Sequence, residues 1–215
     1  MADVPGIEDI FINHPYDPFY RELKLSMVFA IHACGFRARS AEERINGLTT
    51  RVERIEGLTR QCRLSIHDLG TYAAWERPHY NMAFEFGICF GYHRSAVLLP
   101  DQRLPVPSTL VLVNTRKEIA YFSDIAGIDP EFHESDPLKI ILHIRTWLQG
   151  VRGSLPGIHS LQQLYQEFLD VLPGLIEALG HRRFADLAFP ELGGLIANWL
   201  ILRRAEQLGR RTLSP

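Results

Sequence analysis

A glutamate interrupts a run of apolar residues in the middle of the chain. Glu85 follows Met82 and Phe84 and precedes Phe86. Apolar surroundings remove water from the carboxylate and favour its neutral form, and we expect nearby Asp68 to raise its pKa further. A carboxylate in this environment can attack a sugar carbon as a nucleophile, or act as an acid or base. The alternative is that Glu85 only complements the positive N-terminus of its helix.

Further polar residues follow the predicted strands. In an open parallel sheet, ligands bind beyond the carboxyl ends of the strands. Residues at those ends are therefore candidates for substrate binding, with Glu85 and Asp68 as the candidate catalytic residues. The binding candidates are Asn13, His14, Tyr16 and Asp17 after the first strand, His67 at the end of the third, Asn81 at the start of the next helix, and Asp124 after the fourth strand.

Each candidate also has a structural interpretation. His14 and His67 could protonate a leaving base, or be hydrogen-bonded residues at strand ends. Asp17 could accept a ribose hydroxyl or cap the first helix. Tyr16 could stack on a base or pack under a loop. Asp124 could reach a ligand or stabilise its own turn.

Cysteine spacing and missing motifs narrow the chemistry. Cys34, Cys62 and Cys89 are odd in number and far apart, so we expect reduced thiols and no metal site. The sequence has no Gly-x-Gly-x-x-Gly run and no P-loop, so a Rossmann dinucleotide grip is not expected. It also lacks the Gly-x-Ser-x-Gly elbow of α/β-hydrolases. The net charge of −2 gives no basic excess for direct nucleic-acid binding.

Strands are predicted to alternate with helices along the first 150 residues. The alternation requires right-handed crossovers and a parallel sheet with helices on both faces. We therefore predict an α/β fold whose five-stranded doubly wound parallel sheet has the flavodoxin-like order 2-1-3-4-5. Asn81 is the predicted N-cap of the helix at 82–92, and 93–108 is expected to be mostly loop. The predicted strands are 7–13, 36–41, 62–69, 109–114 and 128–132, and the predicted helices are 19–34, 48–61, 82–92, 117–125 and 137–149.

A helical segment is predicted after this domain. Three glycines and a proline at 150–157 indicate a linker between a domain at 1–150 and a helical tail at 151–215. Apolar residues recur three or four apart at 159–178 and 191–208, which predicts two amphipathic helices, with Pro173 breaking or kinking the first. Two short helices bury too little area to stand alone. They must pack on the domain, on a second copy or on another protein, and we favour homo-oligomer formation or docking of a partner protein.

Targeting signals are not evident in the sequence. The first residues lack the charged and apolar regions of a signal peptide, and no apolar stretch is long enough to span a membrane. We therefore expect a cytoplasmic protein that does not associate with membranes.

One run of the sequence resembles a known motif. Residues 77–87, Arg-Pro-His-Tyr-Asn-Met-Ala-Phe-Glu-Phe-Gly, resemble the Arg-Pro…Asn-Val-x-Phe-Glu-Leu-Gly motif of bacterial TIR-like nucleotide-binding domains. The same run is similar to the helix that carries the nucleophilic glutamate of nucleoside 2-deoxyribosyltransferases. Residues 11–17 and 66–69 fall where those folds keep the ends of their first and third strands. The resemblance covers about residues 7–149.

The resemblance implies cleavage of an N-glycosidic bond. TIR-like members split nicotinamide from NAD, and deoxyribosyltransferases move a deoxyribose between bases. By this resemblance Glu85 is the nucleophile, Asp68 helps to hold the leaving base or ribose, and NAD or another nucleotide is a substrate rather than a cofactor. Departures from the family patterns are the Arg77–His79 region, where deoxyribosyltransferases often place an acid, and Asn81-Met82, where many TIR domains have Trp-Cys.

Three functions remain open from the sequence. The first is an NADase-like N-glycosidase, a hydrolase of the kind that serves bacteria as an antiviral defence effector. The second is a non-catalytic nucleotide-binding or signalling module that works by association with a partner. The third is a structural interaction protein without a ligand.

Overall fold

The computed structural model describes residues 9–43, 47–71, 80–99, 106–121 and 128–212. Five parallel strands form one sheet in the order β2-β1-β3-β4-β5. This confirms the predicted α/β class, the parallel sheet and its flavodoxin-like strand order. The strands are β1 (Asp9–Asn13), β2 (Arg37–Ser40), β3 (Leu64–Asp68), β4 (Ser108–Val113) and β5 (Glu131–Phe132).

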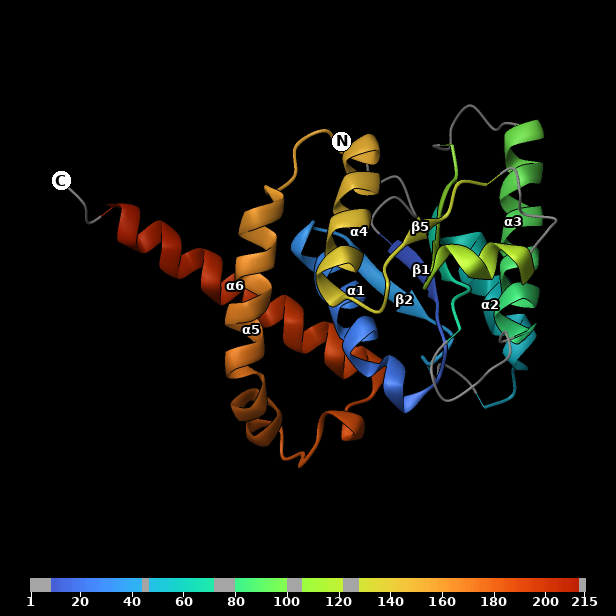
Figure 1. The fold of residues 1–215 in the computed structure, drawn as a ribbon. Helices are drawn as coiled ribbons and strands as arrows, with labels where there is room; N and C mark the ends of the chain where they lie inside the picture. The colour runs from blue at the N-terminus through green and yellow to red at the C-terminus, as the bar shows by residue number, and fades with distance from the viewer. Residues whose placement is uncertain (1–8, 44–46, 72–79, 100–105, 122–127, 213–215) are drawn as a thin grey trace.

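Helices cover both faces of the sheet. Figure 1 shows α1 and α4 on one face and α2 and α3 on the other. The helices are α1 (Arg21–Ala33), α2 (Arg51–Gln61), α3 (Tyr80–Leu98), α4 (Pro137–Val151), α5 (Ile158–Ala178) and α6 (Phe189–Thr212), with short 3-10 helices η1 (Pro18–Tyr20), η2 (Arg116–Tyr121) and η4 (Phe184–Asp186). Among the described residues, no helix combines the length and apolar character needed to cross a membrane.

Alternation along β1 assigns its side chains to the two faces. Ile10 and Ile12 belong to the large core that includes α1 and α4, whereas Phe11 packs with residues of α2 and α3. Successive strand residues point to opposite sides. Asn13 therefore shares the α2–α3 side with Phe11, which places its amide beside α3.

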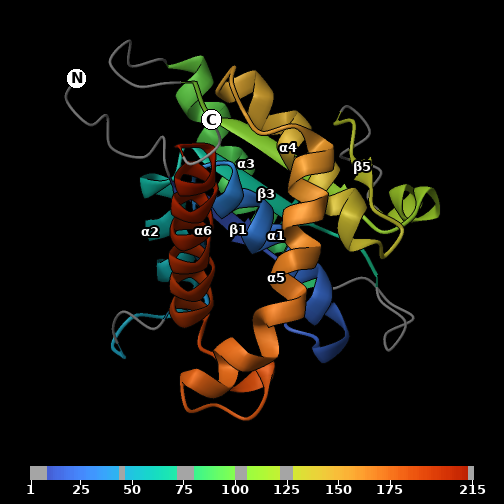
Figure 2. The ribbon, with the colours of Figure 1, turned by 90° about the vertical axis from the view of Figure 1, so that its left-hand side faces the viewer.

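The C-terminal helices form a third layer over α1. The ring centroid of Phe29 on α1 lies 5.1 Å from that of Tyr165, 5.5 Å from that of Phe168 and 6.3 Å from that of Trp199. Figure 2 shows α5 and α6 beside α1, and their buried residues belong to the same hydrophobic core as the sheet. The tail therefore packs on the first 150 residues, while its predicted role in association stays a prediction.

The structure corrects the predictions for α3, for α5 and for the helix at 117–125. α3 begins at Tyr80 and ends at Leu98, so Asn81 lies inside the helix and residues 93–98 are not loop. The His93 ring, 3.2 Å from both the Thr109 hydroxyl and the Cys62 carbonyl, anchors these last turns to the sheet. α5 continues through Pro173 without a break. The predicted helix at 117–125 is the 3-10 helix η2 as far as residue 121, and residues 122–127 lie outside the described part.

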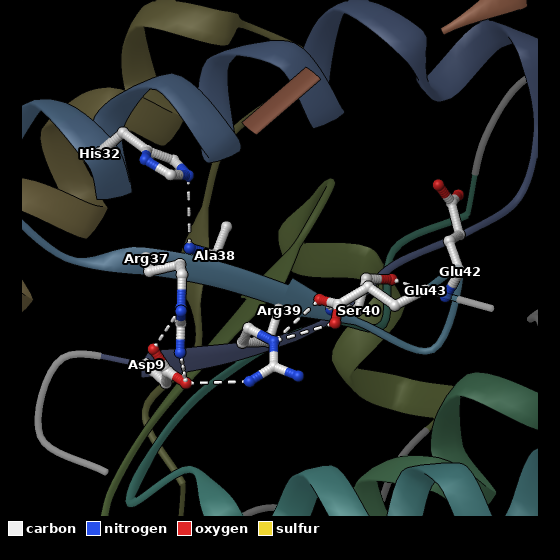
Figure 3. Close-up of polar contacts among 8 residues, drawn as sticks. All are labelled: Asp9, His32, Arg37, Ala38, Arg39, Ser40, Glu42 and Glu43. Atoms are coloured by element: carbon white, nitrogen blue, oxygen red, sulfur yellow. Dashed lines mark hydrogen bonds and ion pairs between the residues drawn. The ribbon is translucent and has the colours of Figure 1, made fainter. Parts of the chain in front are cut away.

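Two arginines of the edge strand β2 pair with one aspartate of the neighbouring strand. Arg37 donates to Asp9 on β1 from Nε (2.7 Å) and Nη2 (2.6 Å), and Arg39 donates to the same carboxylate from Nη1 (2.9 Å). Figure 3 shows both guanidinium groups converging on Asp9. Their attraction lowers the pKa of Asp9 against the opposing effect of burial. The two charges thus tie β2 to β1 across the sheet surface.

Candidate functional site

Glu85 is buried where α3 meets the start of α2. Its side chain is 4% exposed, and Oε1 accepts a hydrogen bond from Nε of Arg51 at 2.9 Å, with Nη2 of the same guanidinium at 2.7 Å. Arg51 is the first residue of α2, which the Thr50–Glu53 capping box fixes. Among the described residues, Oε2 of Glu85 has no hydrogen-bond partner. One oxygen of the carboxylate is therefore engaged and the other is free.

Burial controls the acidity of this carboxyl group. Burial raises the pKa of Glu85, and the charge and hydrogen bond of Arg51 lower it without cancelling the effect. The predicted direction is thus confirmed. Asp68, which the sequence analysis expected to contribute, is not among the groups that shift this pKa.

Tyr16 completes a three-residue cluster with Arg51 and Glu85, named here the Glu85 cluster. The guanidinium carbon of Arg51 stands 4.3 Å from the centroid of the Tyr16 ring. This is cation–π geometry, in which the aromatic face attracts the cation. The loop after β1, the start of α2 and the first turns of α3 therefore meet through side chains of three different types.

Asn13 and His67 form a second polar pair on the same side of the sheet. The Asn13 amide donates from Nδ2 to the Met82 carbonyl (3.0 Å) and lies 3.2 Å from Nδ1 of His67. Burial, with a smaller effect of His93, lowers the pKa of His67 to about 3, so its ring is neutral at pH 7. Since Nδ1 accepts from Asn13, the ring proton resides on Nε2. That buried Nε2 has no hydrogen-bond partner.

Several buried polar side-chain atoms near the ends of β1 and β3 and the start of α2 have no hydrogen-bond partner among the described residues. Native proteins rarely leave such atoms unpaired, and where they do, a ligand or water is the usual explanation. All belong to the loop or strand ends of β1 and β3 or to the first turn of α2, apart from the Thr59 hydroxyl farther along α2. The atoms are Asn13 Oδ1, His14 Nε2, Asp17 Oδ2, Arg54 Nε and His67 Nε2, together with Nη2 of Arg51, which meets Glu85 by charge alone.

Asp68 lies on the other side of the sheet. Its side chain is fully buried, and Oδ2 accepts from the Tyr20 hydroxyl at 2.8 Å and lies 3.2 Å from Nε2 of His133. Oδ1 accepts from the Gly70 backbone N–H at 2.8 Å. Nδ1 of His133 accepts from the Ser135 N–H, so Nε2, which lies near Asp68, carries the ring proton. Asp68 and Glu85 are therefore not brought together, and His133 was missed by the sequence analysis.

The remaining predicted residues divide between the two sides. His14 is buried against Tyr20, with ring centroids 5.6 Å apart, and burial lowers its pKa to about 4. Asp17 accepts from the Phe19 N–H at 2.8 Å, which is the helix-capping role considered above. Asn81 is exposed on the first turn of α3, and Asp124 lies outside the described residues.

A cavity of about 190 Å³ adjoins the loop after β1. Tyr16 and Asp17 line one wall, and Phe184 and Leu187 of the C-terminal segment line another. Glu85 is not part of this lining. The sequence analysis did not anticipate this cavity, because only the folded tail brings residues 184–192 to the β1 loop.

No metal-ligating group of three His, Cys, Asp or Glu side chains occurs within the described ranges. Comparisons with family models, with curated proteins and with solved structures give no match to this chain.

Proposed function

We propose that this protein cleaves the N-glycosidic bond of NAD or a related nucleotide, with Glu85 as the nucleophile. The observation that carries the proposal is a buried carboxylate with one oxygen engaged and the other without a partner among the described residues, on the helix that Asn13 and His67, each with an unpaired buried atom, contact at Met82 and Phe86. The resemblance of residues 77–87 to TIR-like and deoxyribosyltransferase motifs supports the same role.

The reaction follows from the free oxygen of Glu85. Oε2 attacks the anomeric carbon as the bond from this carbon to the base breaks, and the electron pair leaves with the base. Water then attacks the same carbon and loses a proton to solvent, while the bond from this carbon to Oε2 breaks and its electron pair returns to the Glu85 carboxylate. Arg51 holds Oε1 and favours the ionised carboxylate that this step requires.

The neutral histidines favour a substrate whose base leaves without protonation. His67 and His14, with pKa values lowered to about 3 and about 4, carry no extra proton to donate at neutral pH. Nicotinamide departs from NAD as a neutral base because its ring nitrogen is cationic in the substrate. A purine or pyrimidine base, in contrast, needs an acid. NAD is therefore favoured over deoxynucleosides as the substrate.

Arginines at the start of α2 suit a phosphorylated substrate. The Arg51 side chain is 39% exposed, and Nε of Arg54 has no hydrogen-bond partner in the part of the chain that the structure describes. Guanidinium groups bind phosphate oxygens in a planar fork, and the N-terminus of a helix adds positive potential. We therefore assign the diphosphate of the substrate to this end of α2, with Tyr16 available to stack on a ring.

A second candidate is a nucleotide-binding module without turnover. The ion pair that ties Oε1 of Glu85 to Arg51 favours it, because a paired carboxylate is a weaker nucleophile. Incubation of the purified chain with NAD and, separately, with deoxyadenosine tests both candidates by chromatography of the released base. Nicotinamide release that is absent in Glu85→Gln supports catalysis, whereas calorimetric binding of NAD without release supports the module.

A further inference from the structure

An unusual face of α3 remains uncovered in the folded chain. The helix buries one side, where Met82, Glu85, Phe86, Cys89 and His93 face the sheet and α2. The opposite side carries residues spaced i, i+4, i+7 and i+11, which share one face of a helix. This α3 outer face consists of Tyr80, Phe84, Gly87, Gly91, Arg94, Ser95 and Leu98, all exposed.

The α3 outer face is apolar where a surface helix is normally charged. Tyr80 is 74% exposed, Phe84 59% and Leu98 66%, and Arg94 is the only charged residue among them. A helix that is apolar on all sides is normally buried on all sides. Figure 1 places α3 at the edge of the molecule away from α5 and α6, so the tail does not cover it.

Packing within the chain does not require the two glycines of this face. Apart from the neighbouring backbone of α3 itself, no atom of the described residues lies within 4 Å of the position that a Cβ would occupy at Gly87 or Gly91. Each glycine in a helix interior costs about 1 kcal/mol relative to alanine. Close approach of a second helix is the condition under which their missing side chains are useful, because small residues let two backbones come together.

We propose that a second copy of this chain docks here, with the two α3 helices antiparallel about a twofold axis at the level of Cys89. This arrangement places Gly87 opposite Gly91 of the second copy. It also places Phe84 opposite Arg94 of the second copy and Tyr80 opposite Leu98 of the second copy. An aromatic ring thus meets a cation, which is a favourable pair, and the two arginines stay apart.

The exposed area is close to what a dimer requires. With about 150–250 Å² for each fully exposed aromatic side chain, the outer face and its flanking Phe90 and Val97 expose on the order of 500 Å² of apolar side chain per copy. A standard protein interface buries roughly 800 Å² per partner, part of it polar. The glycines, Ser95 and Arg94 supply the remainder, and no segment of the tail is required.

The proposal is tested by the mass of the full chain in solution. We expect light scattering to give about twice 24.6 kDa at micromolar concentration. Phe84→Glu and, independently, Arg94→Glu should weaken dimerisation by about tenfold or more, since the twofold axis makes the Phe84–Arg94 contact twice in the interface. Ile201→Glu, at an equally exposed position of α6, is the matched control and should stay dimeric. Circular dichroism confirms that each variant is folded.

A mixing experiment tests the antiparallel register. Gly87→Cys and Gly91→Cys chains, oxidised together, should give a disulfide-linked heterodimer, whereas either variant alone should give much less. A monomeric wild-type chain, an unchanged mass for both Phe84→Glu and Arg94→Glu, or dissociation by Ile201→Glu alone would each overturn the proposal. Linkage of each variant to itself without the mixed product would overturn the register.

Discussion

The guanidinium of Arg51 reaches Glu85 across 34 positions of sequence and donates from Nε to Oε1 at 2.9 Å. The same guanidinium covers the ring of Tyr16. One arginine therefore joins the loop after β1 to the helix that carries the proposed nucleophile. It also opposes the effect of burial on the acidity of Glu85.

Replacement of Arg51 by glutamine should raise the pKa of Glu85 further. The arginine stabilises the ionised carboxylate, and its loss leaves burial unopposed. Base release requires ionised Glu85, so the acidic limb of the pH–rate profile should move to higher pH. Carbon-13 NMR of the Glu85 carboxyl group gives the same titration without reference to activity. An unchanged titration would show that the ion pair is not maintained in solution.

Asp68→Asn should destabilise the fold. Asp68 accepts hydrogen bonds from Tyr20 and the Gly70 backbone in a fully buried position, and its Oδ2 lies 3.2 Å from Nε2 of His133. Removal of a buried charge that accepts such bonds costs about 2 kcal/mol or more. Urea unfolding measures the loss, and Tyr20→Phe, which removes only one bond, should cost less. A native-like midpoint with weakened nucleotide binding would instead assign Asp68 to the ligand.

Acidification should destabilise the protein below about pH 6.5. Burial lowers the pKa of His14 and of His32 to about 4 and that of His67 to about 3. Between these values and the unfolded value of 6.5 the unfolded chain binds more protons, so stability is fully present above pH 6.5 and falls as pH decreases. Each such proton is worth about 1.4 kcal/mol per pH unit.

Urea unfolding midpoints measured from pH 7.5 to pH 5 test this predicted loss of stability. Because the pKa of Glu85 is raised, this residue makes the folded state more stable as the pH falls. The contribution of this one group is smaller than the combined contribution of the three histidines. Glu85→Gln removes this opposing effect and should steepen the decline. A flat profile over this range would mean that the histidines are not buried as the structure places them.

Removal of the tail should expose the core rather than release an independent domain. The rings of Tyr165, Phe168 and Trp199 pack around Phe29 on α1. We expect deletion of residues 151–215 to give insoluble protein and Phe168→Ala to cost about 3–5 kcal/mol. The control Leu202→Ala, at an exposed position of α6, should change stability by less than about 0.5 kcal/mol. A soluble, folded truncation would contradict this account.

Local patterns were sufficient to predict the sheet. The apolar run of β4 and the alternation of strands with helices determined a parallel order, and the structure confirms it. The end of α3 was predicted six residues too early, because the anchor of its last turns is a tertiary contact. His93 contacts Thr109 and the Cys62 carbonyl, and these contacts cannot be predicted from the local sequence.

The candidate site was predictable in part. Glu85 was identifiable because a lone acid in an apolar helix is unusual. Arg51 was not, because an arginine at the start of a charged helix is indistinguishable from a solvated residue until α2 and α3 pack. The separation of Asp68 from Glu85 follows from strand alternation, which sends Asp68 toward Tyr20 and His133. A position near the end of a strand does not by itself determine on which face of the sheet a side chain lies.

The most direct test of the central claim is nicotinamide release from NAD by wild-type protein and by Glu85→Gln. The amide keeps the size of the carboxylate and removes its nucleophilic charge. We predict nicotinamide release by the wild type and none above background by Glu85→Gln. The free energies of unfolding of the two proteins near neutral pH should agree within about 1 kcal/mol. Equal rates of nicotinamide release by the two proteins would contradict the assignment of Glu85 as the nucleophile.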